Sequence, residues 1–248
     1  MHTRGRTPPL DRRQLRRIGA LTGLTGLARM VLPVSCPGCA APDRRICRDC
    51  ARAFGSPPLP VPDLTGQAPP WWRTGNPAIS AVACYRGAVR RVLVAWKEGG
   101  RSDLDPLIAH ALAASVRHAA VAAAGVGPGP PLVLVPVPSR RASCWQRGRW
   151  PLGEVSTRLS GLGVGLPVRP VLRMASGVRD QAGIGAHERH ANLSGRLRMV
   201  APIADDARVL LVDDIVTTGA SLDAARRALR PWPVVGAAVV AATTTRHG

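Results

Sequence analysis

The sequence predicts an α/β protein in which a parallel β-sheet is flanked by helices and preceded by a small cysteine-rich module. Short apolar runs without polar alternation are typical of parallel strands that are buried on both faces. Such runs occur at 132–137, 209–212 and 234–243, with helical stretches before and between them. Two Cys-x-x-Cys pairs lie upstream of these runs, in CPGC at 36–39 and CRDC at 47–50.

Residues 1–26 are expected to form a flexible basic arm that leads into the start of an apolar helix. Six arginines and a single acidic residue, Asp11, lie within 1–17, and two prolines interrupt regular structure there. Such an arm either contacts a polyanion or stays solvated, and the sequence leaves both open. The uncharged run 18–28 is too short to span a membrane and lacks a small-residue cleavage box. We therefore expect a soluble cytoplasmic protein without membrane insertion.

The segment 27–54 is predicted to be a zinc ribbon. Two CxxC units separated by seven residues suit two knuckles around one tetrahedral Zn²⁺, and the expected ligands are Cys36, Cys39, Cys47 and Cys50. Four thiolates close the coordination shell, so the zinc should be structural. Disulfide pairing is the alternative, but paired CxxC units favour metal in a reducing cytosol. Cys84 and Cys144 lack partners at motif spacing and are expected to be small buried residues.

Residues 55–76 begin with a Pro-rich stretch and are expected to form an extended linker, and residues 77–248 form the main domain. Its expected elements are strands at 81–85, 132–137, 209–212 and 234–243 and helices at 88–96, 104–124, 153–160 and 221–230. Arg117 and His118 interrupt the apolar helix, which argues against a membrane span. The segment 169–196 is polar and weakly periodic, as functional loops or irregular surface excursions are.

The most informative stretch is VLLVDDIVTTGAS at 209–221. Its apolar strand leads into Asp213 and Asp214, and ligands of open α/β sheets bind beyond the carboxyl ends of strands. Carboxylates at this edge accept hydrogen bonds from vicinal sugar hydroxyls or hold a hard cation. Backbone N–H groups and hydroxyls of the following loop suit a phosphate at a helix N-terminus, and they belong to Thr217, Thr218, Gly219, Ala220 and Ser221. The stretch predicts a sugar-phosphate site, whereas a buried strand with a simple turn explains the carboxylates poorly.

This stretch resembles the phosphoribosyl-pyrophosphate motif of type I phosphoribosyltransferases. The resemblance implies that Asp213 and Asp214 contact the ribose hydroxyls and that the loop binds the 5′-phosphate. A zinc ribbon upstream of such a domain is similar to the competence-protein ComF family, over about Leu27 to Arg246. Further similar stretches are LARMVLPVSC, ACYRGAVRRVLVAWKEGG, LVLVPVPSRR, QRG and VRDQAGIGAHERHANLSGRL. The chain departs from the usual RGFNQ of the family, because it reads RGRWP at 147–151.

The resemblance implies a transferase reaction in which pyrophosphate leaves the anomeric carbon, with Mg²⁺ held mainly by donor oxygens and the Asp213 and Asp214 carboxylates nearby. Arg140 and Arg141 follow the strand 132–137, and guanidinium groups match phosphate oxygens, although both arginines could be surface charges. By resemblance, the segment 169–196 closes over the donor. The residues implied to meet pyrophosphate or to stabilise the closed state are Arg179, Gln181 and Arg189.

The charge balance adds a second class of function. A formal charge of +19, from 34 basic against 15 acidic residues, implies affinity for polyanions. One hypothesis is a phosphoribosyltransferase acting on a nucleobase or related amine. The other is a catalytically silent accessory protein in DNA uptake or DNA handling, which binds single-stranded DNA or a DNA-processing protein. The RGRWP departure and the zinc ribbon favour the second, but a fold alone does not decide between them.

Overall fold

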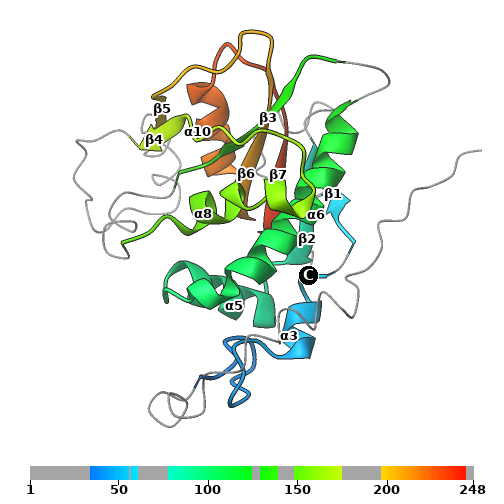
Figure 1. Cartoon of the computed structure of the whole chain (residues 1–248), viewed down its shortest axis with the longest axis vertical. Coiled ribbons are helices and arrows are strands. Elements are labelled where there is room, and N and C mark those ends of the chain that lie inside the picture. Colours follow the sequence, from blue (N-terminus) through cyan, green and yellow to red (C-terminus); the bar gives the residue numbers. More distant parts are fainter. Residues whose placement is uncertain are drawn as a thin grey trace, which may run out of the picture.

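The computed structural model describes residues 34–55, 57–60, 78–124, 129–138, 148–174 and 197–243. A five-stranded sheet forms its centre, with the strand order β1-β2-β7-β6-β3 (Figure 1). The strands are β1 (Leu59–Pro60), β2 (Ala78–Cys84), β3 (Leu132–Pro136), β6 (Arg208–Val216) and β7 (Val234–Ala242). Neighbouring strands from β2 to β3 run parallel, whereas β1 pairs antiparallel with β2. The predicted α/β class with a parallel sheet is confirmed.

Helices cover both faces of this sheet. One face carries α5 (Gly87–Lys97), α6 (Asp105–Ala124) and α8 (Pro151–Thr157), and the other carries α10 (Ala220–Ala228) and a small sheet of β4 (Leu172–Met174) and β5 (Leu197–Met199). Within β6, Leu210 and Val212 belong to the first core, whereas Val209 and Leu211 belong to the second. Because both faces of the strand are buried, its sequence shows no polar alternation.

Each strand and helix predicted for the main domain is present, with ends that differ by a few residues. Two strand pairs were not predicted. Leu59 and Pro60, within the segment expected to be a linker, pair with Ser80 and Ala81, and proline is tolerated there because β1 is an edge strand. The strand β4 lies within the segment 169–196, which was expected to be irregular, and β5 follows that segment directly; each is too short to show a periodic pattern.

The helix α6 is the longest on its face. Together with the preceding 3₁₀ turn it forms a span, Ser102–Ala124, that is long and apolar enough to cross a membrane by length and composition, and half of its apolar window is buried within the fold. Ile108 and Leu112 are fully buried, and the Ser115 hydroxyl donates to the carbonyl oxygen of Val239 at 2.8 Å. These contacts are those of a core helix packed on a sheet.

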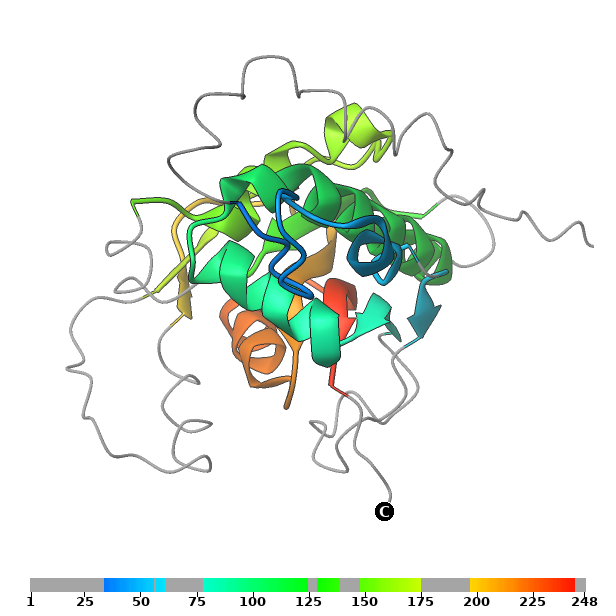
Figure 2. The same cartoon turned by 90° about the horizontal axis from the view of Figure 1, so that it is seen from below.

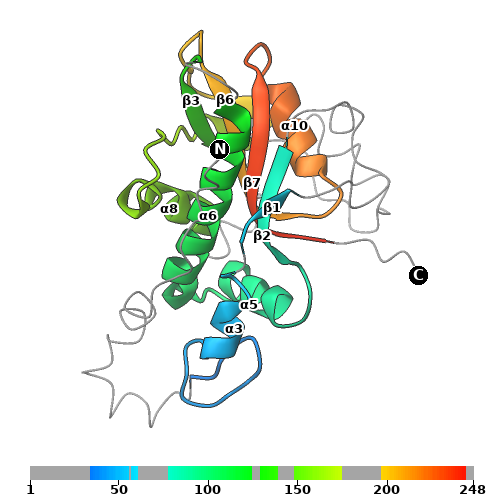
Figure 3. The same ribbon diagram turned by 90° about the vertical axis from the view of Figure 1, so that its right-hand side faces the viewer.

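The N-terminal part of the described chain, residues 34–55, is called the Cys module here. It contains the short helix α3 (Arg48–Arg52) and packs against α5, which lies between α3 and the sheet (Figures 1 and 3). The view from below shows the module in front of the helices (Figure 2). Phe54 is 2% exposed and belongs to the same apolar core as Trp96 of α5. The module and the main domain therefore share one core.

Candidate functional site

The two predicted carboxylates lie near the carboxyl end of β6, inside the strand. Pairing with β7 continues past them, through Asp213↔Val239 and Ile215↔Ala241. Asp213 is 8% exposed and Asp214 is 3% exposed. Each accepts a hydrogen bond from the next backbone amide, at 2.8 Å to Asp213 Oδ1 and 2.9 Å to Asp214 Oδ1. Two adjacent buried carboxylates are costly unless an opposite charge or a ligand lies near them.

The opposite charge comes from Lys97, the last residue of α5. Its Nζ lies 2.5 Å from Oδ2 of Asp214. Burial raises the pKa of Asp213 well above its ordinary range and the charge of Asp214 raises it further, while Lys97 lowers it in part. A carboxyl group with such a raised pKa donates as well as accepts hydrogen bonds, which suits contact with ligand hydroxyls.

The loop after β6 turns directly into α10. Gly219 has a φ of 76°, in the left-handed region that glycine adopts without strain, and α10 begins at Ala220. The amide of Asp223 donates to the carbonyl of Gly219 at 2.9 Å and so closes the first helical turn. The Asp223 carboxylate pairs with Arg226 and Arg227, so its charge at this helix end is balanced within α10. The helix end can therefore accept an external anion.

The predicted phosphate-binding hydroxyls are brought to this loop. Thr217 is exposed, and Thr218 and Ser221 are partly buried. Thr243, which follows β7, anchors the start of the loop because its amide donates to the Val216 carbonyl at 3.0 Å. Its hydroxyl also lies 3.3 Å from the carbonyl oxygen of Thr217. The carboxylates and the hydroxyl loop thus lie consecutively at one edge of the sheet.

The remaining predicted donor-site residues lie outside the described part of the chain: Arg140, Arg141, Arg179, Gln181 and Arg189. The described residues on either side of these segments show where the chain leaves and re-enters the fold. Pro136 at the end of β3 pairs with Val212, so the chain leaves β3 beside the residue that precedes Asp213. Met174 of β4 pairs with Leu197 of β5, so the described residues on either side of the segment 175–196 lie side by side.

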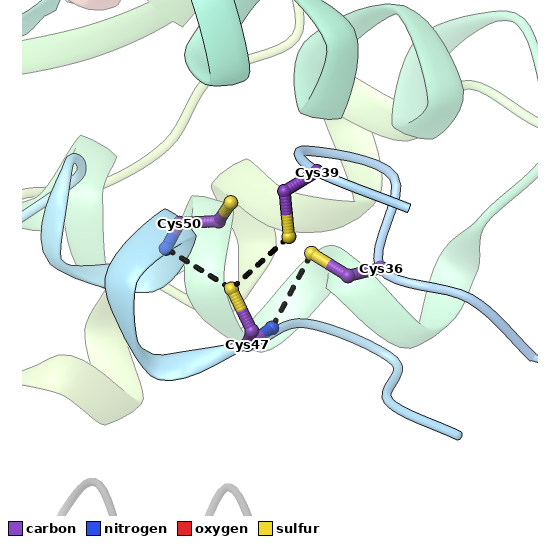
Figure 4. A group of neighbouring side chains, drawn as sticks. All are labelled: Cys36, Cys39, Cys47 and Cys50. Atoms are coloured by element: carbon purple, nitrogen blue, oxygen red, sulfur yellow. Dashed lines mark hydrogen bonds between the residues drawn. The ribbon is translucent and has the colours of Figure 1, made fainter. Parts of the chain in front are cut away.

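The four motif cysteines converge from the turn that holds Cys36 and Cys39 and from the start of α3, with their sulfur atoms close together (Figure 4). All four Sγ atoms lie within 4.8 Å of each other, and those of Cys39 and Cys47 are 3.6 Å apart. Tetrahedral Zn–S bonds of about 2.3 Å separate sulfurs by about 3.8 Å, so the group fits one such ion. All four thiols are free, which disfavours the disulfide alternative. A four-cysteine group positioned to bind a metal ion, consistent with structural zinc, is confirmed.

Backbone amides favour the thiolate form of Cys36, whereas burial and the neighbouring thiols raise the pKa of Cys50. The amide of Cys47 lies 3.4 Å from the sulfur of Cys36, and that of Cys50 lies 3.4 Å from the sulfur of Cys47. Burial raises the pKa of Cys36, but backbone hydrogen bonds from Cys47, Gly38 and Cys39 outweigh burial and lower this pKa to about 6. Since thiolates are the metal-binding form, Cys36 is ready to act as a ligand near neutral pH.

Gly38 is the point at which the Cys module meets α5. A Cβ at this position would lie 2.5 Å from Cys50 Sγ and 3.3 Å from Val92 Cγ2. The carbonyl oxygen of Gly38 accepts hydrogen bonds from Arg91, at 2.8 Å from Nε and 2.5 Å from Nη2. Glycine is therefore required for close approach, and a guanidinium group of α5 holds the first knuckle in place.

Arg101, just beyond α5, fixes the module from a second direction. Its guanidinium group donates to the carbonyl oxygens of Ser35 at 3.2 Å and Arg45 at 2.9 Å. Asp103 orients the same group through two bonds of 2.8 Å. Arg91 and Arg101 thus donate to backbone carbonyl groups beside both CxxC units.

The RGRWP departure has an architectural explanation. Arg149 donates to both oxygens of Asp105, at 2.9 and 3.0 Å, and pairs with Glu154 at 2.8 Å. Trp150 and Pro151 start α8, with Glu154 accepting from the Trp150 amide at 3.1 Å. Arg149 and Glu154 therefore connect the start of α8 to the start of α6.

Sequence reasoning missed Lys97 and Asp105 and was wrong about Cys84. Lys97 is the single lysine of the chain and directly precedes the Glu-Gly-Gly end of a helix, a signal that could have drawn attention to it. Nothing local marks Asp105, whose role depends on distant arginines. Cys84 is exposed because it is the last residue of β2, where the helical cover ends; Cys144 lies outside the described residues.

The chain matches no family model, and it matches no curated protein. The two motifs and their geometry are therefore the basis for a functional proposal.

Proposed function

We propose that this protein binds phosphoribosyl pyrophosphate and is a cytoplasmic ComF-like phosphoribosyltransferase whose acceptor is unidentified. One observation carries the proposal: Asp213 and Asp214 are buried near the carboxyl end of a central parallel strand, two residues before it ends and the hydroxyl-rich loop that precedes α10 begins. Two adjacent buried carboxylates are costly in a central strand, and ligands of open α/β sheets bind at this edge.

The ligand would contact this edge at two points. Asp213 and Asp214 would bind the vicinal ribose hydroxyls, which can donate hydrogen bonds to carboxylate oxygens. The loop from Thr217 to Ser221 would bind the 5′-phosphate, with hydroxyls, backbone amides and the positive end of α10 turned toward it. Both contacts follow from the resemblance, and the geometry of the described residues is compatible with them.

In the proposed reaction, a nitrogen of the acceptor attacks the anomeric carbon and pyrophosphate leaves with the bonding electrons. The protein would bind and orient the donor and exclude water, which needs little covalent participation. Arg140, Arg141 and Arg179 are the proposed partners of the departing pyrophosphate. Mg²⁺, when bound, would neutralise pyrophosphate charge; Asp214, already paired with Lys97, favours an ion held by donor oxygens over one held by both carboxylates.

Calorimetry with phosphoribosyl pyrophosphate and Mg²⁺ tests the binding, and pyrophosphate release on adding nucleobases tests the transfer. Wild-type protein should bind the donor, and Asp213→Ala combined with Asp214→Ala should abolish binding while the fold persists. The matched control is Asp205→Ala combined with Asp206→Ala, which removes two exposed carboxylates just before β6. Absence of donor binding by the wild type would overturn the proposal.

The second candidate is a catalytically silent accessory protein in DNA uptake or handling. The observation that favours it is a group of exposed arginines on the Cys module: Arg44, Arg45, Arg48 and Arg52. Donor binding without base-dependent pyrophosphate release, together with binding to single-stranded DNA that weakens steeply with salt, would support this candidate. Removal of residues 1–17 should weaken such binding as well, whereas a purely enzymatic role predicts indifference to both changes.

A further inference from the structure

Lys97 has a position that the two motifs do not explain. It is the only lysine among 34 basic residues, and it ends α5, far along the chain from the carboxylates. Its side chain is 32% exposed, whereas that of its partner Asp214 is 5% exposed. The ammonium group therefore lies at the boundary between a buried carboxylate and solvent, where a ligand could reach it.

The backbone under Lys97 is held firmly. Val92, Leu93 and Trp96 of α5 are completely buried. The Trp96 indole donates to Asp105 at 2.8 Å, and Arg91 binds the Cys module from the same helix. A cation at the end of a helix fixed in this way is presented in a defined place, although its four-carbon side chain keeps freedom to move.

The helix that ends in Lys97, α5, lies on the opposite side of the sheet from α10, the helix that follows the predicted phosphate loop. Residues of α5 pack in the core shared with α6 and α8, whereas α10, which follows the loop, packs in the other core. The carboxylate pair lies on β6 between these two layers. Because Lys97 is paired with Asp214, a sugar held by this carboxylate would lie close to the ammonium group.

Ligand contact with Asp214 would also change the pairing of Lys97. Asp214 Oδ1 accepts from the Ile215 amide, and Oδ2 is paired with Lys97. A ribose hydroxyl that donates to Asp214 would share the carboxylate with the ammonium group and so weaken the ion pair. An anionic group on the same ligand would compensate for the loss, because charge-assisted bonds to phosphate oxygens are strong.

We propose that Lys97 is a donor-site residue that exchanges its ion pair with Asp214 for the pyrophosphate group of a pentose phosphorylated at both ends. This inference rests on the proposed function, because it assumes that the carboxylates and the loop bind the ribose 5-phosphate part. It names a residue outside both motifs and assigns it to the end of the ligand that distinguishes phosphoribosyl pyrophosphate from ribose 5-phosphate.

The test compares these two ligands on the full-length, zinc-loaded protein by calorimetry. Lys97→Met should weaken phosphoribosyl pyrophosphate binding by about 10- to 100-fold and ribose 5-phosphate binding by less than about 3-fold. Lys97→Arg should retain most of the pyrophosphate preference. Arg90→Met is the matched control, because it removes a positive charge from an exposed position on the same helix and should leave both affinities unchanged.

A double variant, Lys97→Met with Asp214→Asn, removes the carboxylate that the single change would leave unpaired. Its preference for phosphoribosyl pyrophosphate should remain lower than that of Asp214→Asn alone. Equal weakening of both ligands by Lys97→Met, or no weakening, would overturn the role of Lys97 while leaving the proposed function standing. Failure of the wild type to bind either ligand would overturn both.

Discussion

Replacing Asp105 by asparagine tests whether the RGRWP segment stabilises the fold, through the ion pair that Arg149 forms with Asp105. Asp105 is 2% exposed and accepts hydrogen bonds from the Trp96 indole at 2.8 Å and from Arg149 at 2.9 and 3.0 Å. Arg158 approaches it at 3.4 Å. Asparagine keeps the shape and an acceptor for Trp96, so the change removes mainly the negative charge.

The expected loss of unfolding free energy depends on the partners that Arg149 keeps after the change. Its side chain is 14% exposed, and within the described part of the chain its Nε and Nη1 are buried without a hydrogen-bond partner. Removing one partner of a buried ion pair costs about 3–5 kcal/mol. Glu154 still pairs with Arg149 and is 43% exposed, so we expect the lower end, about 3 kcal/mol. For a chain of this length that corresponds to a fall in Tm of roughly 6–12 °C.

A double-mutant cycle measured by urea unfolding provides the assay. Arg149→Met should also cost about 3 kcal/mol, because among the described residues it leaves the buried carboxylate with Trp96 and the half-exposed Arg158 alone. The double variant should cost about 3 rather than 6 kcal/mol, since no uncompensated charge remains. Additive costs, or a cost below about 1 kcal/mol for Asp105→Asn, would refute the reasoning. Donor affinity of Arg149→Met, measured well below its Tm, should equal that of the wild type.

Three further predictions concern the metal group and the carboxylates. Cys36→Ser and Cys47→Ser should each release about one zinc ion per chain. Both should also lower Tm, because Phe54 of the Cys module lies in the main core. Full metal retention by both variants, measured by elemental analysis, would contradict the metal site. Gly38→Ala should weaken zinc binding in competition with a chelator, because its Cβ would lie 2.5 Å from Cys50 Sγ, and unchanged competition would mean that the module relaxes freely. The pKa of Asp213 is raised in the folded state, so between pH about 4 and that pKa the folded protein keeps a proton that the unfolded chain releases. In Mg²⁺-free buffer, the free energy of unfolding of the wild type should therefore fall as the pH rises across this range. Asp213→Asn should lose this fall and be more stable at neutral pH, and parallel urea-unfolding profiles for the two proteins would contradict the burial argument.

The sheet was predictable because its strands are buried on both faces and their apolar runs are bounded by turn residues. The run at 209–212 located β6, but the strand continues to Val216, since pairing with β7 is maintained through Asp213 and beyond. Periodicity does not reveal such a continuation, because two carboxylates indicate the end of an apolar run. The edge strand β1 was missed for a similar reason: proline is depleted in strands generally but tolerated at an edge.

The site was predictable only where its residues are neighbours in the sequence. Two CxxC units and the consecutive DDIVTTGAS residues carry their own spacing, so the cysteine group and the carboxylate loop could be located in advance. The ion pair of Lys97 with Asp214 and that of Arg149 with Asp105 join distant segments. Their existence depends on how α5 and α8 pack on the sheet, which no local pattern specifies.

The carboxylate pair also bears on why this edge should bind a ligand at all. Burying two adjacent acids in a central strand destabilises the fold, as the raised pKa of Asp213 indicates, and Lys97 offsets only part of that cost. Apolar residues at 213 and 214 would continue the run VLLV and serve the core better. A local arrangement that opposes folding is expected chiefly where function requires it. If Asp213→Asn gains stability while losing donor affinity, the same carboxylate is responsible for both effects, and the cost in stability is explained by ligand binding.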